Sequence, residues 1–116
     1  IFMKQNRKLI NRENTEHYNW KKVCVGWHCI TTDELSVIAE KIPPHTEENM
    51  HFHTKQFLYS LGEAIMQFKN EAVQLKVGTG IKIDPMEAHQ MRNVSDGEMN
   101  FIVVFTPKSH RGRELV

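Results

Sequence analysis

The sequence predicts an all-β domain, a sandwich or barrel of short strands, and three observations carry that prediction. Short runs rich in Val, Ile, Phe and Trp recur along the chain, and several alternate apolar and polar residues with a period of two. Gly, Pro, Asn and Asp interrupt these runs at short intervals. No stretch shows the long 3.6-residue period of an amphipathic helix. Together these features are typical of antiparallel β folds.

The strands are expected to begin after a polar N-terminal segment. Residues 23–31 are rich in Val, Ile and Trp, and residues 35–40 alternate between two faces before Pro43 and Pro44 end the run. A strand with two histidines follows at 50–57. Later strands are expected at 57–61, 64–68, 73–77, 81–83, 88–94 and 99–105. Periodicity alone does not separate a sandwich from a barrel.

Length and composition indicate one soluble domain. The chain has 116 residues, so we expect an arm at 1–20 and a single domain at 21–116. A net charge of +1 without a concentrated basic face argues against nucleic acid as a partner. No run is long enough to span a membrane, and the first residues lack the order of a secretory signal. Cys24 and Cys29 are placed to face opposite sides of one strand, which fits two free thiols and a cytoplasmic location.

Two stretches carry the candidate chemistry. His51 and His53 are one residue apart, so on a strand both imidazoles lie on one face, where they could ligate a transition metal. The alternative is a pair of surface or hydrogen-bonded histidines. The second stretch, residues 78–93, contains Gly78, Gly80, Pro85, His89 and Asn93.

Together the two stretches resemble the paired motifs of the cupin superfamily, over about residues 26–116. Pro85, His89 and Asn93 match the second motif, with Glu87 where the family usually has Gly. In the first motif His45 stands where the family often has Gly, and Gln56 takes the acidic position one or two residues early. The resemblance implies a double-stranded β-helix, or jelly-roll barrel, like that of small metal-binding cupins.

The resemblance also implies a mononuclear metal site. Its ligands would be His51, His53 and His89, with Gln56 as a fourth, and the ion would be one divalent transition metal: Zn, Fe, Mn, Ni, Co or Cu. The alternative for the histidines is a polar pocket without metal. The alternative to metal ligation by Gln56 is a structural role in the strand, because on a continuous strand its side chain would face away from His53. Strand phase places Tyr59, Met91 and Phe101 in the pocket, although such residues also form ordinary cores.

The expected function is therefore an open metal site for a small polar ligand, acid-like or sugar-like, with Lewis-acid chemistry if the protein is an enzyme. A non-enzymatic binding module and a metal-dependent dioxygenase are the alternatives. Glu47, Glu48 and Glu63 are the available carboxylates, and the first two are interpreted as solvated loop residues.

We also expect a homodimer, because apolar residues stand on the otherwise polar arm. The alternative is an arm folded back onto its own barrel. These residues are Ile1, Phe2, Leu9, Ile10 and Trp20.

Overall fold

The computed structural model describes residues 9–20, 23–52, 56–106 and 114–115. In these ranges the chain forms twelve strands and no helix, which confirms the all-β prediction. No helix there is long and apolar enough to cross a membrane. The strands are β1 His17–Trp20, β2 Cys24–Thr31, β3 Ser36–Ile42, β4 Thr46–Glu47, β5 His51–Phe52, β6 Gln56–Ser60, β7 Ala64–Phe68, β8 Ala72–Leu75, β9 Gly80–Ile83, β10 His89–Asn93, β11 Met99–Phe105 and β12 Glu114–Leu115.

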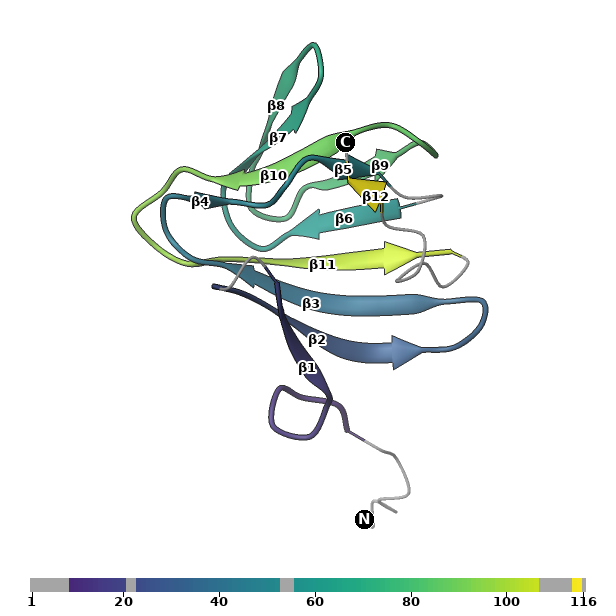
Figure 1. The fold of residues 1–116 in the computed structure, drawn as a ribbon. Coiled ribbons are helices and arrows are strands. Elements are labelled where there is room, and N and C mark those ends of the chain that lie inside the picture. The colour runs from purple at the N-terminus through teal and green to yellow at the C-terminus, as the bar shows by residue number, and fades with distance from the viewer. Residues whose placement is uncertain (1–8, 21–22, 53–55, 107–113, 116) are drawn as a thin grey trace, which may run out of the picture.

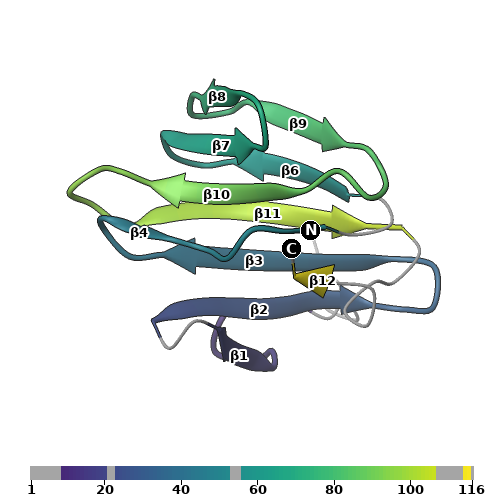
Figure 2. The same cartoon turned by 45° about the horizontal axis from the view of Figure 1, so that its top comes forward.

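The strands form two antiparallel sheets. The first has the order β1-β2-β3-β11-β6-β9, and the second has the order β12-β5-β10-β7-β8, with β4 also paired to β10. Strand β1 lies at one end of the molecule and the β7–β8 hairpin at the other (Figures 1 and 2). The described strands leave both sheets open, so the predicted barrel is two facing sheets rather than a closed cylinder. Non-consecutive neighbours in both sheets bring distant segments of the chain together.

The core lies between the two sheets. Strands β3 and β11 pair over seven residues each, and every second side chain of both is buried. The same alternation in β6, β7 and β10 supplies the other side of the core. The larger fully buried apolar side chains are Phe101, Ile42, Leu58, Met66, Leu75, Ile83, Met91 and Met99. The period of two read from the sequence therefore predicts the alternation, and it identifies the inward faces of β10 and β11 correctly.

The end of the predicted arm is part of the first sheet. Residues 17–20 form β1, which pairs along its whole length with β2, from His17 opposite Trp27 to Trp20 opposite Cys24. Trp20 packs against the core of its own domain. Cys24 and Cys29 are not joined by a disulfide. The first eight residues of the arm lie outside the described ranges.

Candidate functional site

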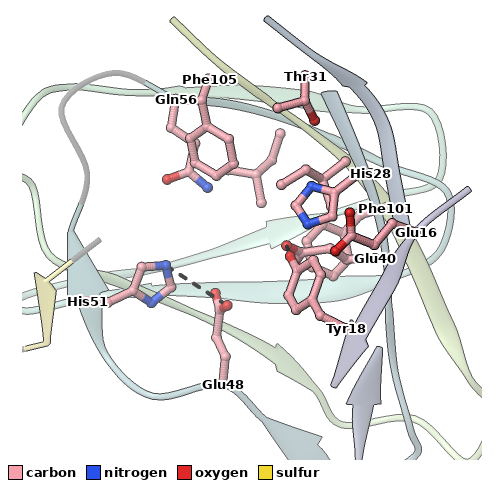
Figure 3. Close-up of a pocket in the computed structure, with 12 residues that line it drawn as sticks. Glu16, Tyr18, His28, Thr31, Glu40, Glu48, His51, Gln56, Phe101 and Phe105 are labelled. Carbon is pink, nitrogen blue, oxygen red and sulfur yellow. Dashed lines mark hydrogen bonds and ion pairs between the residues drawn. The ribbon is translucent and has the colours of Figure 1, made fainter. Parts of the chain in front are cut away.

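A pocket of about 500 Å³ opens between the sheets, and its polar side chains stand on two facing walls. Figure 3 shows His51 and Glu48 on one side and Tyr18, Glu40 and His28 on the other. Between them the lining is mostly apolar. The lining residues are Glu16, Tyr18, His28, Thr31, Ile38, Glu40, Glu48, His51, Gln56, Leu58, Phe101 and Phe105.

Two of the predicted metal-binding histidines are brought together by strand pairing. His51 on β5 lies directly opposite His89 on β10, and the ring centroids are 4.5 Å apart at an interplanar angle of 58°. Both rings are buried. The sequence separates these residues by almost forty positions, so their contact depends on the crossover that places β5 beside β10.

Backbone carbonyls orient both rings. His51 Nδ1 lies 2.7 Å from the carbonyl oxygen of Asn49, and His89 Nδ1 lies 2.9 Å from that of Glu87. Because a carbonyl oxygen only accepts hydrogen bonds, each Nδ1 carries the proton. In the neutral ring the lone pair is then on Nε2, and this is the tautomer in which a histidine ligates a metal through Nε2.

Glu48 is a buried carboxylate beside His51. It is only 4% exposed, and its Oε1 lies 4.0 Å from His51 Nε2 (Figure 3). Its Oε2 accepts a hydrogen bond of 2.8 Å from the backbone N–H of Met91, which holds the side chain toward β10. The interpretation of Glu48 as a solvated loop residue is therefore wrong. Glu47 does face outward, where it pairs with Arg92 at 3.1 Å.

Gln56 lines the same pocket as His51. It is 6% exposed, and its Oε1 is buried with no hydrogen-bond partner among the described residues. The argument that Gln56 faces away assumed one continuous strand. Instead, β5 belongs to the second sheet and β6, which begins at Gln56, to the first. The change of sheet turns Gln56 toward the pocket, where its oxygen is available to a ligand.

Of the remaining predicted pocket residues, only Phe101 lines the pocket. Met91 is fully buried in the core and reaches the site through its backbone N–H. Tyr59 does not line the pocket: it is 40% exposed on the outer face of β6, because Leu58 and Ser60 occupy the inner face. The phase of β6 is the opposite of the one assumed. His53 lies outside the described residues.

The donors that the structure describes fit a metal in part. The two correctly oriented imidazoles and the buried Gln56 oxygen are the kinds of ligand that divalent transition metals accept. Among the described residues, however, no group of three His, Cys, Asp or Glu side chains is arranged to hold a metal ion. Completion of the predicted set depends on His53.

Comparison with solved structures identifies the fold. The chain is similar to the polyketide cyclase RemF from Streptomyces resistomycificus, with 16% identity, coverage of 95% of this chain and 85% of that one, and a TM-score of 0.78. It is similar to a conserved protein with a double-stranded β-helix domain from Klebsiella pneumoniae (18% identity, 95% and 97% coverage, TM-score 0.79). It is also similar to an RmlC-like cupin from Shewanella frigidimarina (20% identity, 90% and 95% coverage, TM-score 0.75).

These likenesses show the fold, and they confirm the double-stranded β-helix that the two motifs predicted. No protein-family model and no curated protein matches the sequence. At such low identity the functions of the similar proteins do not transfer with the fold.

Proposed function

We propose that this chain, which has the cupin double-stranded β-helix fold, is a metal-binding protein that holds a small ligand in the pocket beside His51. The observation that carries the proposal is the buried pair of His51 and His89, both oriented by backbone carbonyls with Nε2 as the lone-pair nitrogen. Each ring thus presents the nitrogen through which a histidine ligates a metal.

The proposed ligands are His51, His89 and His53, with Gln56 as a fourth donor. A divalent transition metal in such a set supplies Lewis-acid polarisation of a ligand oxygen and keeps exchangeable coordination positions. The neutral Gln56 does not lower the charge of the site as a carboxylate would. For this reason we place Lewis-acid chemistry or simple binding ahead of dioxygen chemistry.

The chain itself supplies the surroundings of the ligand. Phe101, Phe105 and Leu58 cover its carbon skeleton and exclude water. Glu48 offers a hydrogen-bond acceptor beside His51, held in place by the backbone of β10. These residues would bind and orient the ligand whether the protein is an enzyme or a non-enzymatic binding module.

Metal analysis tests the proposal. The purified chain is loaded with Zn(II), Fe(II) or Mn(II), desalted and analysed for metal by mass spectrometry, in parallel with the variants H51A, H53A and H89A. We expect about one ion per chain in the parent protein and at least about a tenfold loss in each variant, because each removes a direct ligand.

The matched control is His45→Ala. His45 is exposed, and its Nε2 lies 2.6 Å from Asp96 on the surface, so this variant removes an imidazole without touching the site. Circular dichroism confirms that each variant is folded, and H89L replaces H89A if the smaller side chain unfolds the core. Full metal occupancy in folded H89A or H89L would overturn the proposal.

A further inference from the structure

The wall opposite His51 contains a tyrosine–glutamate pair that the metal site does not use. Three residues lie in one row across the first sheet: Tyr18 on β1 is opposite Gly26 on β2, which is opposite Glu40 on β3. The Tyr18 hydroxyl crosses the intervening strand and donates a hydrogen bond of 3.0 Å to Glu40 Oε1. Glu40 is buried, so the bond holds a carboxylate inside the pocket.

Gly26 makes this bond possible. A Cβ at position 26 would lie 2.4 Å from Cζ and 2.6 Å from the hydroxyl oxygen of Tyr18, closer than atoms can approach. The ring therefore occupies the space that any other residue would fill. The His28 ring also packs against the Tyr18 ring, with centroids 4.9 Å apart. The position of the Tyr18 hydroxyl is set by three neighbouring strands.

The pocket is rich in hydrogen-bond acceptors. Glu40 and Glu48 face it from opposite walls, and Glu16 stands at its edge (Figure 3). Gln56 adds a buried Oε1 with no hydrogen-bond partner among the described residues. No Lys or Arg is among the described residues that line the pocket. Such a site favours a ligand that donates hydrogen bonds and disfavours a negative charge.

The space between the polar walls is apolar. Ile38, Leu58, Phe101 and Phe105 line it, and all four are buried. Among the described lining residues, a divalent ion beside His51 would at most balance the two buried carboxylates and would leave no net positive charge to hold an acid. The ligand chemistry is therefore narrower than the acid-like or sugar-like class expected from the sequence.

We infer that the pocket binds an uncharged, ring-bearing alcohol or phenol, whose hydroxyl group hydrogen-bonds to the Tyr18–Glu40 pair. This inference rests on the proposed function only in placing a ligand in the pocket beside His51. It assigns to Tyr18 and Glu40 the recognition of one end of the ligand, across the pocket from the proposed metal ligands.

The test compares two probes, benzyl alcohol and benzoate. They share an aromatic ring, and they differ in whether the polar group donates a hydrogen bond or carries a negative charge. Dissociation constants are measured by ligand-observed NMR on the full chain loaded with metal. We expect benzyl alcohol to bind at least about tenfold more tightly than benzoate, because two buried carboxylates repel the anion.

Three variants locate the effect. Tyr18→Phe keeps the ring and removes the hydroxyl. It should raise the dissociation constant of benzyl alcohol about three- to tenfold. G26A should give a similar loss with the hydroxyl still present, because the new Cβ displaces the Tyr18 ring. Glu40→Gln removes the negative charge at nearly constant size. It should reduce the ratio of the dissociation constants of benzoate and benzyl alcohol. The control is Tyr59→Phe, whose ring lies outside the pocket.

Tighter binding of benzoate than of benzyl alcohol, binding of neither probe, or equal losses in Tyr18→Phe and Tyr59→Phe would each overturn the inference. Metal analysis of the same samples keeps the two proposals apart. A preference for the alcohol in a chain that retains no metal would support this inference and overturn the proposed metal site.

Discussion

Asn93 illustrates how much one buried side chain of this fold does. It is 1% exposed, and its Nδ2 lies within 3.0 Å of the carbonyl oxygens of Ile42, Pro43 and Gly97. Its Oδ1 accepts hydrogen bonds from the backbone N–H and the hydroxyl of Ser95. The side chain thus joins the end of β3 to the turn that follows β10. Asn suits this position because its side chain offers two donors and an acceptor together.

We expect Asn93→Ala to destabilise the chain by about 3 kcal/mol, since it leaves several buried carbonyl groups without a donor. The measurement is the free energy of unfolding in urea. The control is Asn19→Ala on the exposed side of β1, which should cost less than about 0.5 kcal/mol. Equal losses in the two variants would contradict the assigned role.

At the scale of elements, two turns have a conformation that their residues do not favour. His45, before β4, has φ of 53°, and Met86, before β10, has φ of 66°. Both values are in the left-handed region, where a side chain clashes with the backbone. His45 stands where the cupin motif often has Gly, and Met86 directly precedes another such position. At His45 the left-handed backbone thus coincides with a departure from the motif, whereas at the second turn it falls on Met86, one residue before the departure at Glu87.

Met86→Gly should stabilise the chain by about 0.5 kcal/mol and raise the melting temperature by about 2–4 °C. Relief of left-handed strain of about 1–2 kcal/mol is partly offset by the larger entropy of glycine in the unfolded chain. Met86 is 63% exposed, so little packing is lost. Thermal unfolding checks the expectation, with Met86→Ala as the control. A glycine variant no more stable than the alanine variant would show that the turn is not strained.

At the scale of the whole molecule, the first sheet has an edge available for association. Strand β1 is the last strand of that sheet, and among the described strands it pairs only with β2. Just before it, Leu9 and Ile10 are 73% and 45% exposed. An unpaired edge beside exposed apolar side chains is a site where two copies can pair. Homodimerisation through the N-terminal segment remains our expectation.

Light scattering at micromolar concentration should show a dimer for the parent chain. Simultaneous replacement of Leu9 and Ile10 by Asp should shift the equilibrium to monomer, with at least a tenfold weaker association, because burial of each side chain contributes about 1.5–3 kcal/mol. Val77→Asp is the control: Val77 is exposed far from β1 along the fold, after β8. A monomeric parent chain would contradict the expectation.

Local pattern by itself determined most of the longer strands and some of their inward faces. The period of two identified the buried sides of β10 and β11, because alternation is a property of the strand backbone. The double-stranded β-helix was implied by the resemblance of the stretches around His51 and around Pro85, His89 and Asn93 to the cupin motifs, and the similar solved structures confirm it. Tyr59 was misplaced because a single shift of strand phase exchanges the two faces.

Only the tertiary structure decided what the pocket contains. Gln56 faces the site because the chain changes sheets between β5 and β6, and Glu48 is buried because β10 supplies a backbone donor for it. Tyr18 and Glu40 meet across a glycine on a third strand. The burial of Glu48 and the Tyr18–Glu40 bond leave no local pattern in the sequence, because each depends on which strands become neighbours. Local spacing along the chain does not show which distant strands pair with one another in a β fold.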